Sequence, residues 1–151
     1  MKSLRFRLFA TMAGAVLCGL VAPARLGAES GEQGFDLKAG QEVTFAVTVA
    51  DGKVTMGAPR PSRLGAAQPK DGEITIGLTT KDKTLYEQVL VTEKTAVPID
   101  FLATGLVGGT KIDEAVLCGN IGAPVSKRIG AMSWKVRVHA FEARKAGATC
   151  E

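Results

Sequence analysis

The single histidine, His139, is the one side chain of this sequence with an ordinary pKa near neutrality, so a general base would have to use it. No serine stands in the G-x-S-x-G setting of a nucleophile elbow. The acids are scattered, and neither Asp82 nor the pair Asp113-Glu114 has the spacing of a calcium loop. We therefore expect no catalytic residue, no metal and no cofactor. The alternative is an enzyme whose site is assembled in space from scattered acids and His139.

The three cysteines could bind a metal, exchange disulfides or form a structural bridge. Cys18 lies in an N-terminal leader, residues 1–28, which leaves Cys118 and Cys150. Metal sites need more ligands, and redox pairs usually stand as C-x-x-C. Two leftover cysteines of an exported chain most simply pair with each other. We expect a Cys118–Cys150 disulfide that holds the C-terminal segment against the domain.

Residues 1–28 have the three regions of a secretory signal peptide. Basic residues come first, an apolar run follows over residues 8–22, and the small residues Gly27 and Ala28 end the segment. The run is shorter than the roughly twenty apolar residues of a spanning helix. Cleavage after Ala28 is favoured over cleavage after Ala24, because Pro23 stands beside the second site. Residues 29–151 then form a single domain, periplasmic or secreted, with no membrane span.

Loss of the leader removes the positive charge of the chain. Four of the 19 basic residues and none of the 15 acidic ones lie within residues 1–28, so residues 29–151 carry no net charge. Nucleic-acid binding rests on a basic excess of the folded domain. We therefore expect no nucleic-acid partner.

Basic residues gather in the last third of the chain. Lys127 and Arg128 precede an expected strand, and Lys135, Arg137 and His139 alternate along one face of it. Cations two residues apart on a strand lie about 7 Å from each other, near the spacing of anionic groups on a glycan or lipid surface. This face is a candidate binding surface. The alternative is a solvated face whose cations pair with acids on neighbouring strands.

Alternation of apolar and polar residues dominates the sequence. It predicts strands at residues 43–49, 53–58, 73–79, 85–92, 97–104, 112–118 and 132–141. Asp51-Gly52, between the first two, is a strong signal for a two-residue hairpin turn. Short strands with no helical period predict an all-β fold, an antiparallel β-sandwich of the immunoglobulin-like class with one disulfide. A small β-barrel is the alternative.

The segment FDLKAGQEVTF, residues 35–45, resembles the first strands of cupredoxins and related sandwich domains. The resemblance implies a sandwich topology. A blue-copper site would need two histidines, a free cysteine and usually a methionine. Because His139 is the sole histidine, the resemblance does not imply copper.

Residues 58–72 form the longest expected connection. Pro59, Pro61 and Pro69 keep this segment out of a central strand. Long connections in compact domains are often functional, and Arg60 and Arg63 could contact an anionic partner here. The alternative is a flexible, solvated crossover between sheets. Residues 29–35 are expected to be unstructured, and residues 143–148 to form a terminal turn.

The absence of a catalytic motif favours an exported, non-catalytic binding or interaction protein of a bacterial envelope. The expected partners are an envelope protein or an anionic glycan or lipid surface, met by the basic face or by the proline-rich connection. The bacterial origin rests on the leader and on Asn120, the only asparagine, which is not in an N-x-S/T site. Besides an enzyme with a site assembled in space, a module that assembles by strand addition is an alternative.

Overall fold

The structure is a computed structural model that describes residues 33–80, 86–131 and 135–150. Over these residues the chain forms strands and no helix, and the strand pairs are antiparallel. The strands are β1 (Gly34–Leu37), β2 (Gln41–Ala50), β3 (Lys53–Met56), β4 (Arg60–Arg63), β5 (Glu73–Thr80), β6 (Tyr86–Glu93), β7 (Ile99–Val107), β8 (Thr110–Leu117), β9 (Val125–Ala131) and β10 (Lys135–Ala143).

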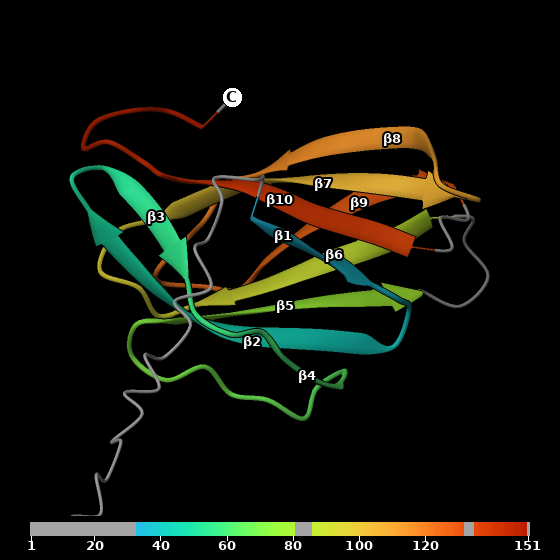
Figure 1. The fold of residues 1–151 in the computed structure, drawn as a ribbon, viewed down its shortest axis with the longest axis horizontal. Helices are drawn as coiled ribbons and strands as arrows, with labels where there is room; N and C mark the ends of the chain where they lie inside the picture. Colours follow the sequence, from blue (N-terminus) through green and yellow to red (C-terminus); the bar gives the residue numbers. More distant parts are fainter. Residues whose placement is uncertain (1–32, 81–85, 132–134, 151) are drawn as a thin grey trace, which may run out of the picture.

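The strands form two sheets that face each other (Figure 1). The first sheet has the order β1-β10-β7-β8. The second has the order β3-β2-β5-β6-β9, and β4 also pairs with β2. The expected antiparallel sandwich is thereby confirmed. The predicted leader, residues 1–28, and residues 132–134 of the last expected strand lie outside the described residues.

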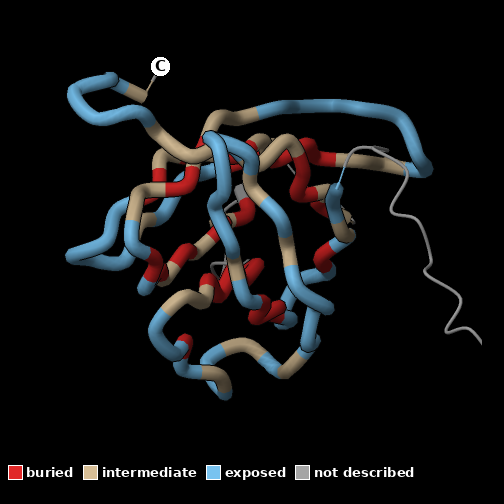
Figure 2. Tube along the Cα trace, turned by 60° about the vertical axis from the view of Figure 1, so that its left-hand side comes forward, coloured by how far each residue is buried: buried red, intermediate tan, exposed pale blue. Residues whose placement is uncertain are grey.

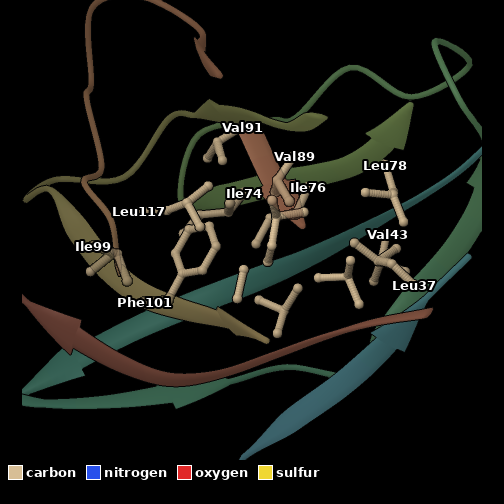
Figure 3. Close-up of a cluster of buried hydrophobic side chains, with 14 of the residues drawn as sticks. Leu37, Val43, Ile74, Ile76, Leu78, Val89, Val91, Ile99, Phe101 and Leu117 are labelled. Atoms are coloured by element: carbon tan, nitrogen blue, oxygen red, sulfur yellow. The ribbon is translucent and has the colours of Figure 1, made fainter. Parts of the chain in front are cut away.

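The hydrophobic core fills the space between the two sheets, and Figure 2 shows the buried positions gathered inside a shell of exposed turns. Both sheets contribute apolar side chains from alternate positions of their strands, as a half-buried sheet requires. Figure 3 shows Ile74, Ile76 and Val89 of the second sheet close to Phe101 of the first. Helices are not needed to cover either inner face.

The Asp51-Gly52 turn joins β2 and β3 as expected. Both residues have positive φ, 52° and 76°, which a type I′ turn requires. The resulting hairpin pairs Val47 with Met56 and Val49 with Val54. Figure 1 shows that this hairpin extends past the end of its sheet.

Strands β1 and β9 arise where the sequence predicts no strand. Gly34 and Phe35, expected to be unstructured, begin β1, which pairs with β10. A Cβ on Gly34 would lie 2.6 Å from the carbonyl oxygen of Val138, so the glycine permits this close pairing. The second of these strands, β9, has weak alternation, because Lys127 occupies the position opposite Val89 where an apolar residue would be expected.

Residues 58–72 were expected to be a flexible, solvated crossover between sheets; most of them are exposed, but they join β3 to β5 of the same sheet and include a strand. Arg60–Arg63 forms β4, with Pro61 opposite Val43 at a sheet edge, where proline is tolerated. The buried carboxylate of Glu42 then anchors residues 62–67. It accepts hydrogen bonds from the Gly65 and Ala67 N–H groups and from the Ser62 hydroxyl.

Packing completes the attachment of this connection. A Cβ on Gly77 would lie 2.5 Å from Cδ1 of Leu64, so Leu64 rests directly on the outer face of β5. Burial would raise the pKa of Glu42, but the donated hydrogen bonds outweigh it and lower the pKa below its ordinary value. The connection is an ordered cover over the second sheet.

Strand β10 contains a β-bulge that changes its inward face. Its pairing with β7 shifts between His139 and Glu142, and Ala140 has a φ of 54°. Alternation with Lys135, Arg137 and His139 on one face predicts Ala140 on the opposite, apolar face. Instead, the bulge turns the Phe141 ring inward, where it contacts the rings of Phe35, Phe45 and Phe101.

The outer strands of the two sheets, β8 and β9, approach each other along one side of the sandwich. Asp113 accepts a hydrogen bond from the Gly130 N–H at 2.6 Å. The Lys127 ammonium donates to the Val116 carbonyl at 2.8 Å. These side-chain bonds join the sheets without a continuous backbone ladder, so the fold keeps the form of a sandwich.

Candidate functional site

An apolar hollow of about 690 Å³ opens at one end of the sandwich. Its aliphatic lining comes from Val47 and Val49 of β2, Ala96 and Val97 of the β6–β7 connection, and Ile121 of the β8–β9 connection. Asp71 and Lys94 are exposed lining residues. This size and this lining are typical of small-molecule sites.

Two residues of this hollow expose unusually large fractions of their surface for aliphatic side chains. Val49 is 38 % exposed and Ile121 is 41 % exposed. Over the described ranges, the third large hydrophobic residue of this kind is Ile112, on β8 away from the hollow. Gathered apolar exposure of this type commonly marks an interaction site.

The length of β2 explains why the hollow is open. The pairing of β2 with β5 ends at Ala46 and Glu73. Beyond it, Val47 and Val49 pair with β3 on the other side, and the Val47 N–H donates one further hydrogen bond to the Gly72 carbonyl at 2.8 Å. Because β2 continues beyond the end of its pairing with β5, the apolar face of the β2–β3 hairpin extends past the sheet and forms one wall of the hollow.

Glu93, the last residue of β6, lies at the base of the opposite wall and is 6 % exposed. Its Oε1 accepts a hydrogen bond from the Ile99 N–H at 2.8 Å and contacts the Thr95 hydroxyl. Burial raises the pKa of this carboxyl above its ordinary value, although hydrogen bonds from Thr95, Ile99 and Asn120 oppose the shift.

The wall that carries Ile121 begins at the expected disulfide, which is confirmed. Cys118 and Cys150 are bonded, with their Cα atoms 5.7 Å apart. Asp100 accepts a hydrogen bond from the Gly119 N–H at 2.9 Å, and Arg144 donates to the Gly119 carbonyl at 3.0 Å. Arg144 also forms a bidentate ion pair with Asp100, in which two guanidinium nitrogens donate to the two carboxylate oxygens.

Asp100 lies close enough to the two cysteines to suggest a metal site, since donor atoms of the three residues lie within 4.8 Å of one another. The sulfurs are joined to each other, however, and a metal requires thiolates. The group therefore acts as a structural bracket around Gly119. A Cβ there would lie 2.5 Å from Oε2 of Glu93 and 2.5 Å from the Ile99 carbonyl oxygen.

The predicted basic face is partly neutralised. Lys135 and Arg137 project from one face of β10, and both lie near Asp36 of β1, at 2.9 Å and 3.6 Å. These contacts favour the alternative of cations paired with acids on a neighbouring strand. The role of Lys135 and Arg137 as a binding surface stays a prediction.

His139 was expected on the same open face, but it is buried. Its Nε2 lies 2.9 Å from the Thr104 hydroxyl, which donates to Glu114 at 2.9 Å. Lys111 pairs with the same carboxylate, and the hydrogen bonds of Lys111 and Thr104 lower the pKa of Glu114. Since the Thr104 proton points to Glu114, Oγ1 must accept a hydrogen from Nε2.

The remaining predicted residues lie on two separate strands. Lys127 and Arg128 precede β10 as expected, but they lie within a strand of their own, β9, and Lys127 is engaged at the sheet junction. Arg60, on β4, forms an ion pair with Glu73 at 2.7 Å. Arg63 ends β4 and is exposed. The structure therefore does not bring the two predicted basic surfaces into one site.

Sequence reasoning missed the hollow. Val47 and Val49 were recognised as strand residues, but the alternation does not show that β5 ends before them. Val97 was expected to begin a strand but lies in the β6–β7 connection, and Ile121 lies in a connection where no alternation marks it. One feature of the sequence could have pointed to the hollow: Ile121 is an aliphatic residue in a short segment rich in glycine and proline.

Comparisons with known proteins give no assignment for this fold or this hollow: no family model matches the chain, and no curated protein or solved structure matches it either. Over the described residues, no helix has the length and apolar character that a membrane crossing requires.

Proposed function

We propose that this chain is an exported, non-catalytic binding protein of the bacterial envelope, and that it holds an aliphatic group of its ligand in the apolar hollow. The observation that carries the proposal is the exposure of Val49 and Ile121 on the walls of a hollow of about 690 Å³. Covering these side chains would remove apolar surface from water, which drives association.

The direction of the hydrogen bonds around His139 supports a non-catalytic binding role over the alternative of an enzyme. A general base must accept a proton from its nucleophile. Here the Thr104 hydroxyl donates to Glu114, so Nε2 of His139 acts as a donor. His139 thus donates to Thr104, which donates to Glu114, and such a chain of hydrogen bonds has a structural role.

The disulfide supports export. Bonded cysteines persist in oxidising compartments such as the periplasm or the cell exterior, and Cys118–Cys150 holds one wall of the hollow. The leader predicted at residues 1–28 agrees with the same compartment.

The hollow is tested with N-phenyl-1-naphthylamine, an uncharged apolar dye whose fluorescence rises in apolar surroundings. We expect the protein to bind the dye, and Val49→Lys and Ile121→Lys each to reduce the affinity strongly. Ile112→Lys is the matched control, because Ile112 is 45 % exposed and lies outside the hollow. Equal binding by all four proteins would contradict the proposal.

The natural ligand is then sought by solvent extraction of protein purified from envelope fractions, with mass spectrometry of the extract. An aliphatic compound retained by the unmodified protein and by Ile112→Lys, but lost from Ile121→Lys, would identify it. Retention by all three proteins would remove the hollow from the assignment.

A further inference from the structure

Glu93 lies where the two connections that wall the hollow meet. The β6–β7 connection, which carries Thr95, Ala96 and Val97, leaves directly from this residue. On its other side Oε2 approaches Gly119, two residues before Ile121. A role for Glu93 in holding the hollow in shape rests on the proposed function, because it concerns the same site.

The hydrogen bonds of Thr95 show which form of Glu93 fits the structure. The Thr95 hydroxyl lies within hydrogen-bond distance of both Oε1 of Glu93 and the Val97 carbonyl oxygen, at 2.8 Å from the latter. A hydroxyl has one proton. If the carboxyl is ionised, both neighbours are acceptors, and one contact lacks a proton.

A neutral carboxyl resolves this shortage. The proton on Oε1 of Glu93 is donated to the Thr95 oxygen, and the Thr95 proton is donated to the Val97 carbonyl. Both contacts are then hydrogen bonds, and the wall is fixed at Thr95 and Val97. Ionisation on raising the pH removes one of them.

The charged groups around Glu93 favour the neutral form. Asp100 of β7 is a negative neighbour, and its effect adds to that of burial in raising the pKa of Glu93. Arg144, after β10, is a positive neighbour of Glu93 but is engaged by both oxygens of Asp100. Lys94 and Asp71 are exposed to solvent at the same hollow.

We propose that Glu93 is a proton-controlled positioning residue: its neutral carboxyl fixes the wall at residues 95–97, and the hollow holds an aliphatic ligand more tightly in this form than when Glu93 is ionised. Release would then accompany a move to higher pH. The device needs no large motion, because the wall already contacts the carboxyl.

The test measures the affinity for N-phenyl-1-naphthylamine from pH 4 to pH 8.5, a range that begins below the ordinary value of 4.5 for a glutamate carboxyl. For the unmodified protein we expect about fivefold weaker binding at the upper end, the equivalent of one lost hydrogen bond. Glu93→Gln should bind with an affinity independent of pH. Thr95→Val should lose the dependence, and Thr95→Ser, which keeps the hydroxyl, should retain it.

Glu42→Gln is the matched control, since Glu42 is another buried glutamate that anchors a connection, on the outer face of the second sheet. It should keep the pH dependence of the unmodified protein. Affinity that is flat with pH in the unmodified protein, while Ile121→Lys still abolishes binding, would overturn the role of Glu93 and leave the proposed function standing.

A second measurement is independent of any ligand. The carboxyl carbon of Glu93, assigned by comparison with Glu93→Gln, should titrate in nuclear magnetic resonance above the ordinary value of 4.5. The amide signals of Thr95 and Val97 should follow the same curve. Titration at or below 4.5, or amide signals that do not respond, would also overturn the role of Glu93.

Discussion

The ring of Phe141 lies 5.3 Å from the ring of Phe101, between centroids, although unbroken alternation along β10 would turn Phe141 outward. The bulge at Ala140 makes this contact possible. The bulge gives Ala140 an irregular backbone conformation and in return allows an aromatic cluster to form in the core. Contacts between aromatic rings stabilise a fold beyond the effect of the area that they bury.

Two substitutions measure separately the backbone strain at Ala140 and the stabilisation that the Phe141 ring provides. Ala140→Gly should raise the free energy of unfolding by about 0.5 kcal/mol, because glycine adopts positive φ without a Cβ clash. Phe141→Ala should lower it by about 3 kcal/mol through loss of the packed ring. Urea unfolding monitored by circular dichroism measures both. A loss of stability in Ala140→Gly would show that the bulge is not strained.

Glu42 should make stability depend on pH. Because its pKa is lowered in the folded protein, its stabilising effect is complete above the unfolded value near 4.5 and is lost as the pH falls through the folded value. Glu42→Gln should therefore lower the free energy of unfolding by about 2 kcal/mol at pH 7. The difference between the two proteins should shrink as the pH falls well below the unfolded value.

Trypsin provides a local readout of the same anchor. Arg63 and Lys70 lie in the connection that Glu42 holds, so Glu42→Gln should be cleaved there faster than the unmodified protein. Glu142→Gln is the control, since Glu142 is exposed on β10. Equal cleavage in all three proteins would contradict the anchoring role.

Removal of the disulfide should show whether the hydrogen bonds of Asp100 and Arg144 to Gly119 are enough to hold this segment in place. Cys118 and Cys150 are 32 residues apart, and on the chain-entropy model their bond contributes about 3 to 4 kcal/mol. We expect the double variant with both cysteines changed to serine to unfold at lower temperature. It should still bind the apolar dye below its melting temperature, because Asp100 and Arg144 continue to hold Gly119. Complete loss of dye binding in the folded variant would assign the wall to the disulfide alone.

Gly119→Ala should damage the hollow more than removal of the bridge. An added Cβ meets the Ile99 nitrogen at 2.6 Å and the Ile99 carbonyl oxygen at 2.5 Å, and backbone atoms have little room to move. We expect a lower melting temperature and weaker dye binding. Gly122→Ala is the control, because its nearest contact is Asn120 Oδ1 at 3.9 Å.

Much of the sheet structure could be predicted from the sequence. Residues with strict alternation, such as Val43 and Phe45, and the Asp51-Gly52 turn depend on local periods and local φ preferences. The disulfide followed from the number of cysteines. Strands β1, β4 and β9 were missed because partners distant in sequence determine them: Gly34 meets Val138, and Pro61 occupies an edge beside Val43.

The candidate site could not be predicted for a related reason. Its walls depend on where β5 ends relative to β2 and on where the bracket holds Gly119. Glu93 appears in the sequence as an ordinary turn residue beside Lys94. Its burial becomes visible only when β7 and the β8–β9 connection are packed around it.

The contacts between β8 and β9 should also be visible in hydrogen exchange. Gly130 lies at the margin of its sheet, where amides ordinarily exchange rapidly, yet its N–H is donated to Asp113 of the opposite sheet. Its exchange then requires this contact between the two sheets to open. Protection of the Gly130 amide should therefore fall in Asp113→Ala, and this amide reports on the contact between β8 and β9.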